Sequence, residues 1–267
     1  MRRAVPLTPL LIRYDHVLID LDGCVWVGEE AVPGAPEAVA ALREAGKSVL
    51  FLTNDVRHSP EGFVRKLWRL GVQASVDEVV SVGAAVQFRL AARQGTAFVV
   101  GTQALVDHVA DAGLRIVNGT PFAPRADVVV IGGHDGLVFE ELKLATQAVL
   151  RGADLVGASR DATFPMPDGP WPGTGAILAA VETAAGRRAS TVVGKPELPM
   201  YEAARDRLGP GRILAVGDRL DVDVAGARRA GMDSGLVLTG ATTRAQVEAA
   251  EEPPTLVADS LAALVLG

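Results

Sequence analysis

The sequence is poor in cysteine, in aromatic residues and in positive charge, and it has no long hydrophobic run. Cys24 is the single cysteine in 267 residues, so an internal disulfide is impossible and a Cys/His zinc cluster lacks ligands. A formal net charge of −6 argues against a large nucleic-acid surface, because such surfaces need clustered basic residues. No apolar stretch approaches the roughly 20 residues of a membrane span. We therefore expect a cytoplasmic protein without nucleic-acid or membrane partners.

The N-terminal stretch MRRAVPLTPLLIRYDHV begins like a signal peptide. Pro6 and Pro9 break its apolar part, Arg13 ends it, and no small-residue cleavage site follows. We expect a tail that leads into the first strand.

Short apolar runs alternate with helical patterns along most of the chain. Residues 17–19 and 48–52 are too short for helices and are typical of buried strands, and residues 35–42 between them repeat at helical spacing. Another helix is predicted from Pro60, with Ser59 as its cap. Further strands are expected at 97–100, 128–131, 155–156, 191–193, 213–216 and 236–238. The alternation predicts an α/β fold with a Rossmann-like parallel sheet.

Four of these strands end in polar residues. The segments are Asp20-Leu21-Asp22-Gly23, Thr53-Asn54-Asp55, Gly194-Lys195-Pro196 and the run from Gly217 to Asp223. Each alone is more typical of a structural turn. Because ligands bind at the carboxyl ends of parallel strands, the four together predict one site.

The residue types in these segments suit phosphoryl transfer. Asp20 and Asp22 share a loop, so one carboxylate can attack while the other moves protons. Asp20 and Asp218 offer the hard oxygen ligands that Mg²⁺ prefers. Lys195 and Thr53 can offset the charge on the phosphoryl oxygens.

The same segments resemble the motifs of the haloacid dehalogenase (HAD) superfamily phosphatases. They read IDLDGCVWVG, FLTND, VVGKPELPMY and VGDRLDVDVAGA, in the family's order and over nearly the whole chain. The resemblance is to the NagD-like class IIA branch, which has a C2-type α/β cap. It includes phosphatases of p-nitrophenyl phosphate, phosphoglycolate, pyridoxal phosphate, glycerol 3-phosphate and nucleotides.

The resemblance implies roles for the matching residues. Asp20 would be the nucleophile, forming an aspartyl-phosphate, and Asp22 the general acid/base. Phosphate binding would fall to Thr53, the Asn54 amide and Lys195.

The resemblance also implies a metal site. Mg²⁺ would be bound by Asp20, by Asp22 through its backbone carbonyl and by Asp218, with Asp223 in the second shell or acting through water. We expect Asp221 to cap the helix that follows.

Two residues depart from the family motifs. Cys24 stands where Thr or Val is usual, and Asp55 where Asn is usual. Neither replaces a catalytic group, but Asp55 adds negative charge beside a phosphate site.

The spacing of the motifs predicts where a cap is inserted. About thirty residues separate Asp22 from Thr53, which is room for one crossover helix, whereas roughly 140 separate Thr53 from Lys195. We therefore expect a HAD catalytic core at 1–84 and 184–267, with an inserted cap at 85–183. The resemblance allows for a homodimer formed through the cap.

A lid of this size would favour a small phosphorylated metabolite over a phosphoprotein. We expect substrate specificity to depend on cap segments 132–135 and 159–165, where replacing His134 and Arg160 with Ala should change KM between substrates. The candidate residues are His134, Asp135, Arg160, Asp161 and Phe164.

The predicted function is hydrolysis of a small phosphomonoester such as glycerol phosphate or phosphoglycolate. Nucleotides, sugar phosphates and pyridoxal phosphate are alternative substrates. A dehalogenase would need neither Asp22 nor Asp218, and a related phosphomutase would need an early cap. A phosphate-metabolite sensor on the same scaffold stays open, because a fold does not fix a function.

Overall fold

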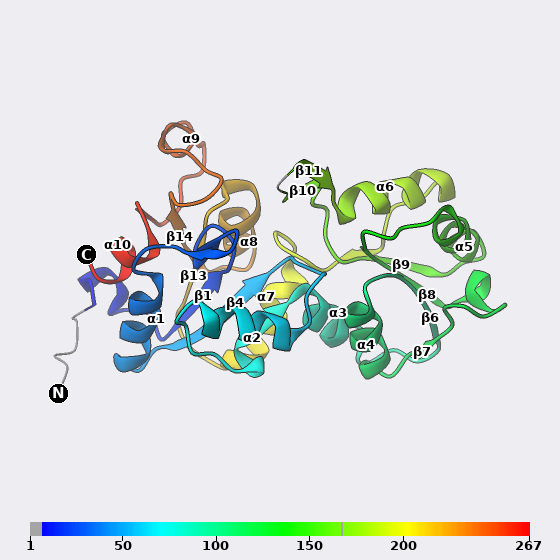
Figure 1. Cartoon of the computed structure of the whole chain (residues 1–267), viewed down its shortest axis with the longest axis horizontal. Helices are drawn as coiled ribbons and strands as arrows, with labels where there is room; N and C mark the ends of the chain where they lie inside the picture. Colours follow the sequence, from blue (N-terminus) through cyan, green and yellow to red (C-terminus); the bar gives the residue numbers. More distant parts are fainter. Residues whose placement is uncertain (1–6, 167) are drawn as a thin grey trace. The chain divides into compact units, whose positions relative to one another are not determined.

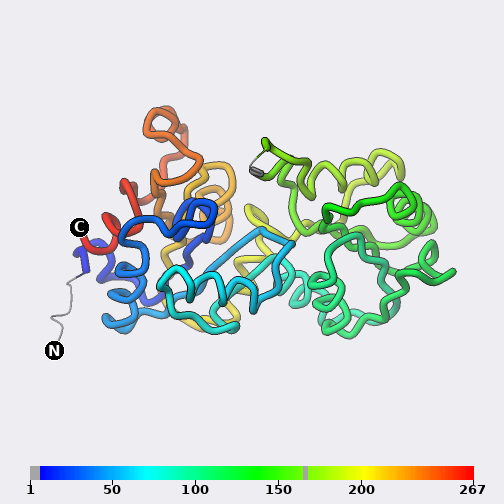
Figure 2. Tube along the Cα trace, in the orientation of Figure 1, coloured from blue at the N-terminus to red at the C-terminus, as the bar shows by residue number. Residues whose placement is uncertain are grey.

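The chain folds into two compact units (Figures 1 and 2). The computed structural model describes residues 7–166 and 168–267, so residues 1–6 of the expected N-terminal tail lie outside the described part. The first unit holds the residues up to 53, 60–80 and 195–267, and the second holds 54–59 and 81–194. The range 85–183, predicted as a cap, lies within the second unit.

A six-stranded sheet forms the centre of the first unit. Its order is β15-β14-β13-β1-β4-β5, and the strands from β15 to β4 pair in parallel. The strands are β1 (His16–Asp20), β4 (Ser48–Thr53), β5 (Val79–Ser81), β13 (Ile213–Gly217), β14 (Asp233–Val237) and β15 (Leu256–Ala258). β1 lies between β13 and β4, so its carboxyl end lies beside theirs.

Helices and one small hairpin surround this sheet. The helices are α1 (Ala35–Glu44), α2 (Pro60–Arg69), α7 (Leu198–Leu208), α8 (Ala225–Arg229), α9 (Arg244–Glu248) and α10 (Leu261–Val265). Single turns occur at Pro9–Leu11 and Val76–Glu78, and a π-helical turn at Leu220–Val224. The hairpin, β2 (Trp26–Val27) with β3 (Glu30–Ala31), follows β1 directly. α1 buries the apolar face that its helical spacing predicts.

The second unit is built around a five-stranded parallel sheet. Its order is β12-β9-β8-β6-β7. The strands are β6 (Thr96–Gly101), β7 (Arg115–Ile116), β8 (Val128–Gly133), β9 (Asp154–Gly157) and β12 (Thr191–Val192). The helices are α3 (Val82–Leu90), α4 (Gln103–Asp111), α5 (Phe139–Leu150) and α6 (Thr174–Ala185), with a single turn at Ala123–Arg125. An antiparallel hairpin, β10 (Thr163–Met166) with β11 (Gly169–Pro172), precedes α6.

The predicted parallel α/β class is confirmed. The sequence patterns missed the edge strands β5, β7 and β15 and both hairpins, because these strands are too short for a two-residue alternation to stand out. Among the described residues, no helix has both the length and the apolar character needed to cross a membrane.

Candidate active site

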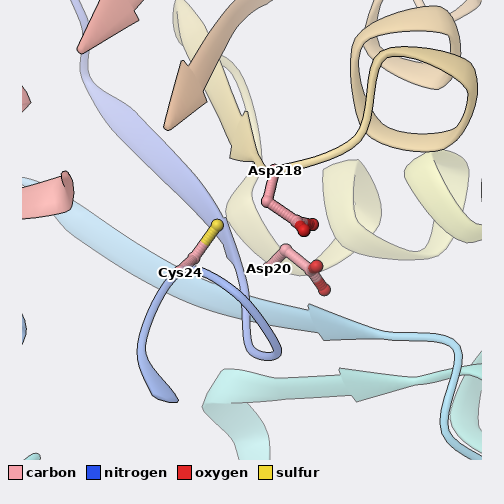
Figure 3. Close-up of side chains that lie close together, drawn as sticks. All are labelled: Asp20, Cys24 and Asp218. Carbon is pink, nitrogen blue, oxygen red and sulfur yellow. The ribbon is translucent and has the colours of Figure 1, made fainter. Parts of the chain in front are cut away.

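Two of the predicted site aspartates lie together at the carboxyl edge of the first unit's sheet. Asp20 is the last residue of β1, and Asp218 follows β13, the neighbouring strand. Their carboxylate groups lie next to each other and turn the same way (Figure 3). The backbone N–H of Ala241 donates to Asp218 Oδ2 at 2.6 Å and fixes that side chain.

Gly23 makes this close approach possible. Its φ of 79° lies in the left-handed region, and a Cβ at this position would meet the Asp218 carboxylate at 2.6 Å. The loop after β1 therefore turns beside Asp218 only because residue 23 has no side chain.

Lys195 joins two carboxylates of the site. Its ammonium group donates to Asp20 Oδ1 at 2.6 Å and to Asp223 Oδ1 at 2.7 Å, and its side chain is only 4% exposed. The other oxygen of Asp223 accepts the backbone N–H of Arg219 at 3.1 Å. Asp223 therefore holds Lys195 in place, a direct contact that the sequence analysis did not foresee.

The charges of this cluster do not balance. Burial raises the pKa of Asp20 well above its usual value, despite the nearby charge of Lys195. Burial, together with the charge of Asp223, also raises the pKa of Asp218. Burial alone would lower the pKa of Lys195, but Asp20 and Asp223 raise it well above its usual value. Lys195 pairs with two of these three carboxylates, so a bound cation would supply further positive charge beside Asp20 and Asp218.

The donor set fits a hard divalent cation. Asp20 and Asp218 each offer a carboxylate oxygen, and these oxygens and Cys24 Sγ all lie within 4.8 Å of one another. Figure 3 shows the sulfur on the opposite side from that to which the carboxylates turn. Carboxylates without a soft donor on the same side are the ligands that Mg²⁺ prefers.

Cys24 has the environment of an inert core thiol. Its side chain is fully buried, and burial with the nearby charge of Asp20 raises its thiol pKa well above the usual value. Cys24, although it replaces the usual Thr or Val, therefore does not add a reactive nucleophile to the site.

Asp22, the predicted acid/base residue, is exposed beside this cluster. Its Oδ1 accepts a hydrogen bond from the indole N–H of Trp26 at 2.8 Å. Trp26 lies within the first motif and has no predicted role. The spacing of four residues in a tight turn was the one available signal.

Two of the predicted phosphate-binding residues, Thr53 and Asn54, lie at the end of β4. Thr53 is its last residue and is 2% exposed, and Leu52 is in register with Asp20 on the adjacent β1. The next residue, Asn54, belongs to the second unit, where its side-chain amide donates to Asp161 Oδ2 at 2.9 Å. Sequence reasoning missed this bond, because 107 positions separate its partners.

The negative charge of Asp55 is locally neutralised. Its carboxylate accepts hydrogen bonds from the Arg57 backbone N–H at 2.7 Å and pairs with His58 Nδ1 at 2.8 Å. Burial opposes ionisation, but the bonds from His58 and Arg57 lower the pKa of Asp55 to about 2. The Asp55 charge is thus matched within its own loop.

The expected helix cap at Asp221 is wrong. Asp221 lies inside the π-helical turn, 73% exposed, and its Oδ2 accepts from Arg219 Nη2 at 2.9 Å. The π-helical turn already begins at Leu220, so Asp221 is inside the turn and not at the capping position before it.

The specificity candidates occupy different parts of the second unit. His134 Nε2 is 2.9 Å from Glu141 Oε1, and Asp135 is exposed in the same loop. Arg160 donates to the buried Glu182 of α6 at 2.8 Å. Phe164, on β10, lies under the guanidinium of Arg57, which is 4.7 Å from the ring centroid.

Comparison with known proteins identifies the family. A model described as haloacid dehalogenase-like hydrolase matches residues 17–115, and a HAD-hydrolase-like model matches residues 192–264. Chronophin from Bos taurus is 38% identical over 265 residues, covering 92% of this chain and 88% of chronophin. Sugar-phosphatase AraL from Bacillus subtilis is 36% identical, covering 92% of this chain and 90% of AraL.

A solved structure is similar to most of the chain. The crystal structure of a glycerol phosphate phosphatase from Mycobacterium tuberculosis in complex with magnesium has a TM-score of 0.90 and 34% identity. The match covers 97% of this chain and 78% of that chain. The protein belongs to the haloacid dehalogenase-like hydrolases.

Proposed function

We propose that this protein is a Mg²⁺-dependent phosphatase that hydrolyses a small phosphomonoester. The observation that carries the proposal is the buried group of Asp20, Asp218 and Lys195, with Asp22 beside it. The names of similar proteins support it, since they include a sugar phosphatase and a glycerol-3-phosphate phosphatase.

In the proposed mechanism, an oxygen of Asp20 attacks phosphorus and forms an aspartyl-phosphate while the bond to the leaving-group oxygen breaks. Asp22 gives its proton to that oxygen and later removes a proton from the water that hydrolyses the aspartyl-phosphate. Mg²⁺, held by Asp20, Asp218 and the Asp22 carbonyl, would neutralise phosphoryl charge. Lys195 and Thr53 bind the phosphoryl oxygens, and Asp223 keeps Lys195 directed at the site.

A small polyol or carboxylate phosphate, such as glycerol phosphate or phosphoglycolate, is the proposed substrate. Sugar phosphates, nucleotides and pyridoxal phosphate are the alternatives. The proposed specificity residues are His134, Asp135, Arg160, Asp161 and Phe164. His134→Ala is the cleaner test among them, because Arg160 pairs with the buried Glu182, whereas Glu141, the partner of His134, is only partly buried. It should change the ratio of KM between substrates by several-fold, and an unchanged ratio would remove His134 from this set.

The second unit is proposed to act as the cap, from about residue 85 to 183. A homodimer through this cap and a cytoplasmic location also belong to the proposal. Sedimentation of the whole protein and of a variant with a charged residue at the exposed Phe139 would test the dimer.

Phosphate release from a panel of these esters tests the activity. Release with Mg²⁺ should stop on chelation, and Asp20→Asn should lower kcat by at least about 10⁴-fold, as removal of a nucleophile does. Tight binding of an ester without any release would instead support the sensor.

A further inference from the structure

The structure assigns Trp26 as a positioning residue for the proposed acid/base residue Asp22. The inference rests on the proposed function. Trp26 is 2% exposed, and its indole N–H donates to Asp22 Oδ1 at 2.8 Å. Asp22 itself is exposed, so without this bond its side chain could take several rotamers.

The backbone brings the two side chains to the same place. Gly23 N–H donates to the Trp26 carbonyl at 2.7 Å, and Trp26 N–H donates to the Leu21 carbonyl at 3.2 Å. These bonds close a tight turn directly after Asp20. The indole therefore has a fixed position relative to the loop that carries both aspartates.

Packing fixes the indole from two further directions. Its ring belongs to the apolar core of the first unit. The ammonium group of Lys66 lies 4.4 Å from the ring centroid, a cation–π distance. Lys66 is held in turn by the Gly28 carbonyl at 2.8 Å and by Glu29 at 3.3 Å.

In this geometry the two oxygens of Asp22 have different roles. Oδ1 accepts the indole N–H, which leaves Oδ2 to face the leaving group. As the bond between phosphorus and the ester oxygen breaks, that oxygen takes the proton from Oδ2 and Asp22 becomes a carboxylate. A hydrogen bond to a carboxylate is stronger than one to the neutral acid, so Trp26 stabilises the charge as it forms.

A comparison of two leaving groups separates positioning from stability. Glycerol is a poor leaving group and needs the proton, whereas p-nitrophenolate leaves without one. Trp26→Phe keeps a buried ring and removes the N–H. It should lower kcat/KM for glycerol phosphate by about 10- to 100-fold, as expected for one bond to a charged group, and for p-nitrophenyl phosphate by less than about threefold.

Trp68→Phe is the matched control. Trp68 also donates its indole N–H, to the Ala74 carbonyl at 2.7 Å, but it is 58% exposed and takes no part in the proposed site. This variant should leave both values of kcat/KM unchanged. In an Asp22→Ala background, Trp26→Phe should cause no further selective loss.

Equal losses for both esters, or no loss in folded Trp26→Phe, would overturn the inference. If Trp26→Phe does not fold, the indole N–H resonance of Trp26 gives the answer, because it should move in Asp22→Ala while that of Trp68 stays in place. An unmoved Trp26 resonance also overturns the inference. A wild-type protein that releases phosphate from none of the esters of the proposed panel would instead refute the proposed phosphatase.

Discussion

Each of the two units buries a carboxylate, but they balance its charge in opposite ways. In the first unit, Lys195 donates to Asp20 and Asp223, Asp218 lies beside Asp20 (Figure 3), and burial raises the pKa of Asp20 and of Asp218. In the second unit, Glu182 is 5% exposed, and its single negative charge is paired with two arginine side chains.

The partners of Glu182 show what a balanced site looks like. Its two oxygens accept from Arg160 at 2.8 Å, from Arg188 at 2.9 Å and from the Ala189 backbone N–H at 2.8 Å. The bond from Arg160, opposed by burial and aided by the other two, lowers the pKa of Glu182 to about 2. A buried carboxylate that is paired with two cations serves the stability of the fold. A site where buried carboxylates outnumber the cations needs a positively charged ligand to balance their charge.

The largest loss of stability is expected in the first unit, where buried carboxylates already outnumber the nearby cations. Lys195→Met would leave Asp20 and Asp223 buried without their cation. We expect it to lower the free energy of unfolding by about 3–5 kcal/mol, the usual cost of breaking a buried pair from one side. Urea unfolding measures this. Lys143→Met, in an exposed pair with Glu140, is the control and should change little.

A Lys195→Met variant no less stable than Lys143→Met would contradict the account. It would mean that the folded state does not depend on Lys195 to offset the charge of Asp20 and Asp223.

Glu182→Gln should have a smaller and pH-dependent effect. A pKa lowered to about 2 in the folded state means that ionised Glu182 stabilises the fold above its unfolded pKa of about 4.3. We expect a loss of about 1–2 kcal/mol near pH 7, discounted because Arg188 is 80% exposed. As the pH falls from about 4.3 towards 2, protonation of Glu182 removes this stabilisation, so the difference between wild type and variant should shrink.

Unfolding in urea at pH 7 and pH 3 measures this difference, with Glu140→Gln as an exposed control. If the difference in the free energy of unfolding between wild type and Glu182→Gln is the same at pH 7 and pH 3, the contrast drawn between the two units is wrong.

The smallest effect is expected at Asp55, which has the same kind of balance in a more exposed loop. Asp55→Asn restores the residue usual in the family. His58 is 53% and Arg57 36% exposed, so we expect a loss of only about 1 kcal/mol near pH 7. Urea unfolding at pH 7 measures this loss. A loss as large as that of Glu182→Gln would show that burial of the partners does not set the size of the effect.

The sequence predicted the parts of the site that depend on strand order. Residues at the carboxyl ends of adjacent parallel strands must lie near one another, so Asp20 and Asp218 could be brought together from the sequence. The core strands could be predicted because they are buried on both faces and read as apolar runs.

Contacts that depend on side-chain direction could not be predicted. The bond from Trp26 to Asp22 requires the turn geometry of the loop, and the bond from Asn54 to Asp161 requires the packing of the second unit. The predicted role of Asp223 near the metal did not include its bond to Lys195, which a side chain on the π-helical turn makes. The spacing of residues in the sequence shows which of them are near one another along the chain, but not the direction in which each side chain points.

The central claim is that Asp20 receives the phosphoryl group. Acid-quenched turnover of the wild-type protein with Mg²⁺ and an accepted ester, followed by mass spectrometry of its peptides, tests this directly. We predict a phosphoryl group on the peptide that contains Asp20, absent in Asp20→Asn and absent without Mg²⁺. Phosphate release that persists in Asp20→Asn, or a phosphoryl group on another residue, would contradict the account.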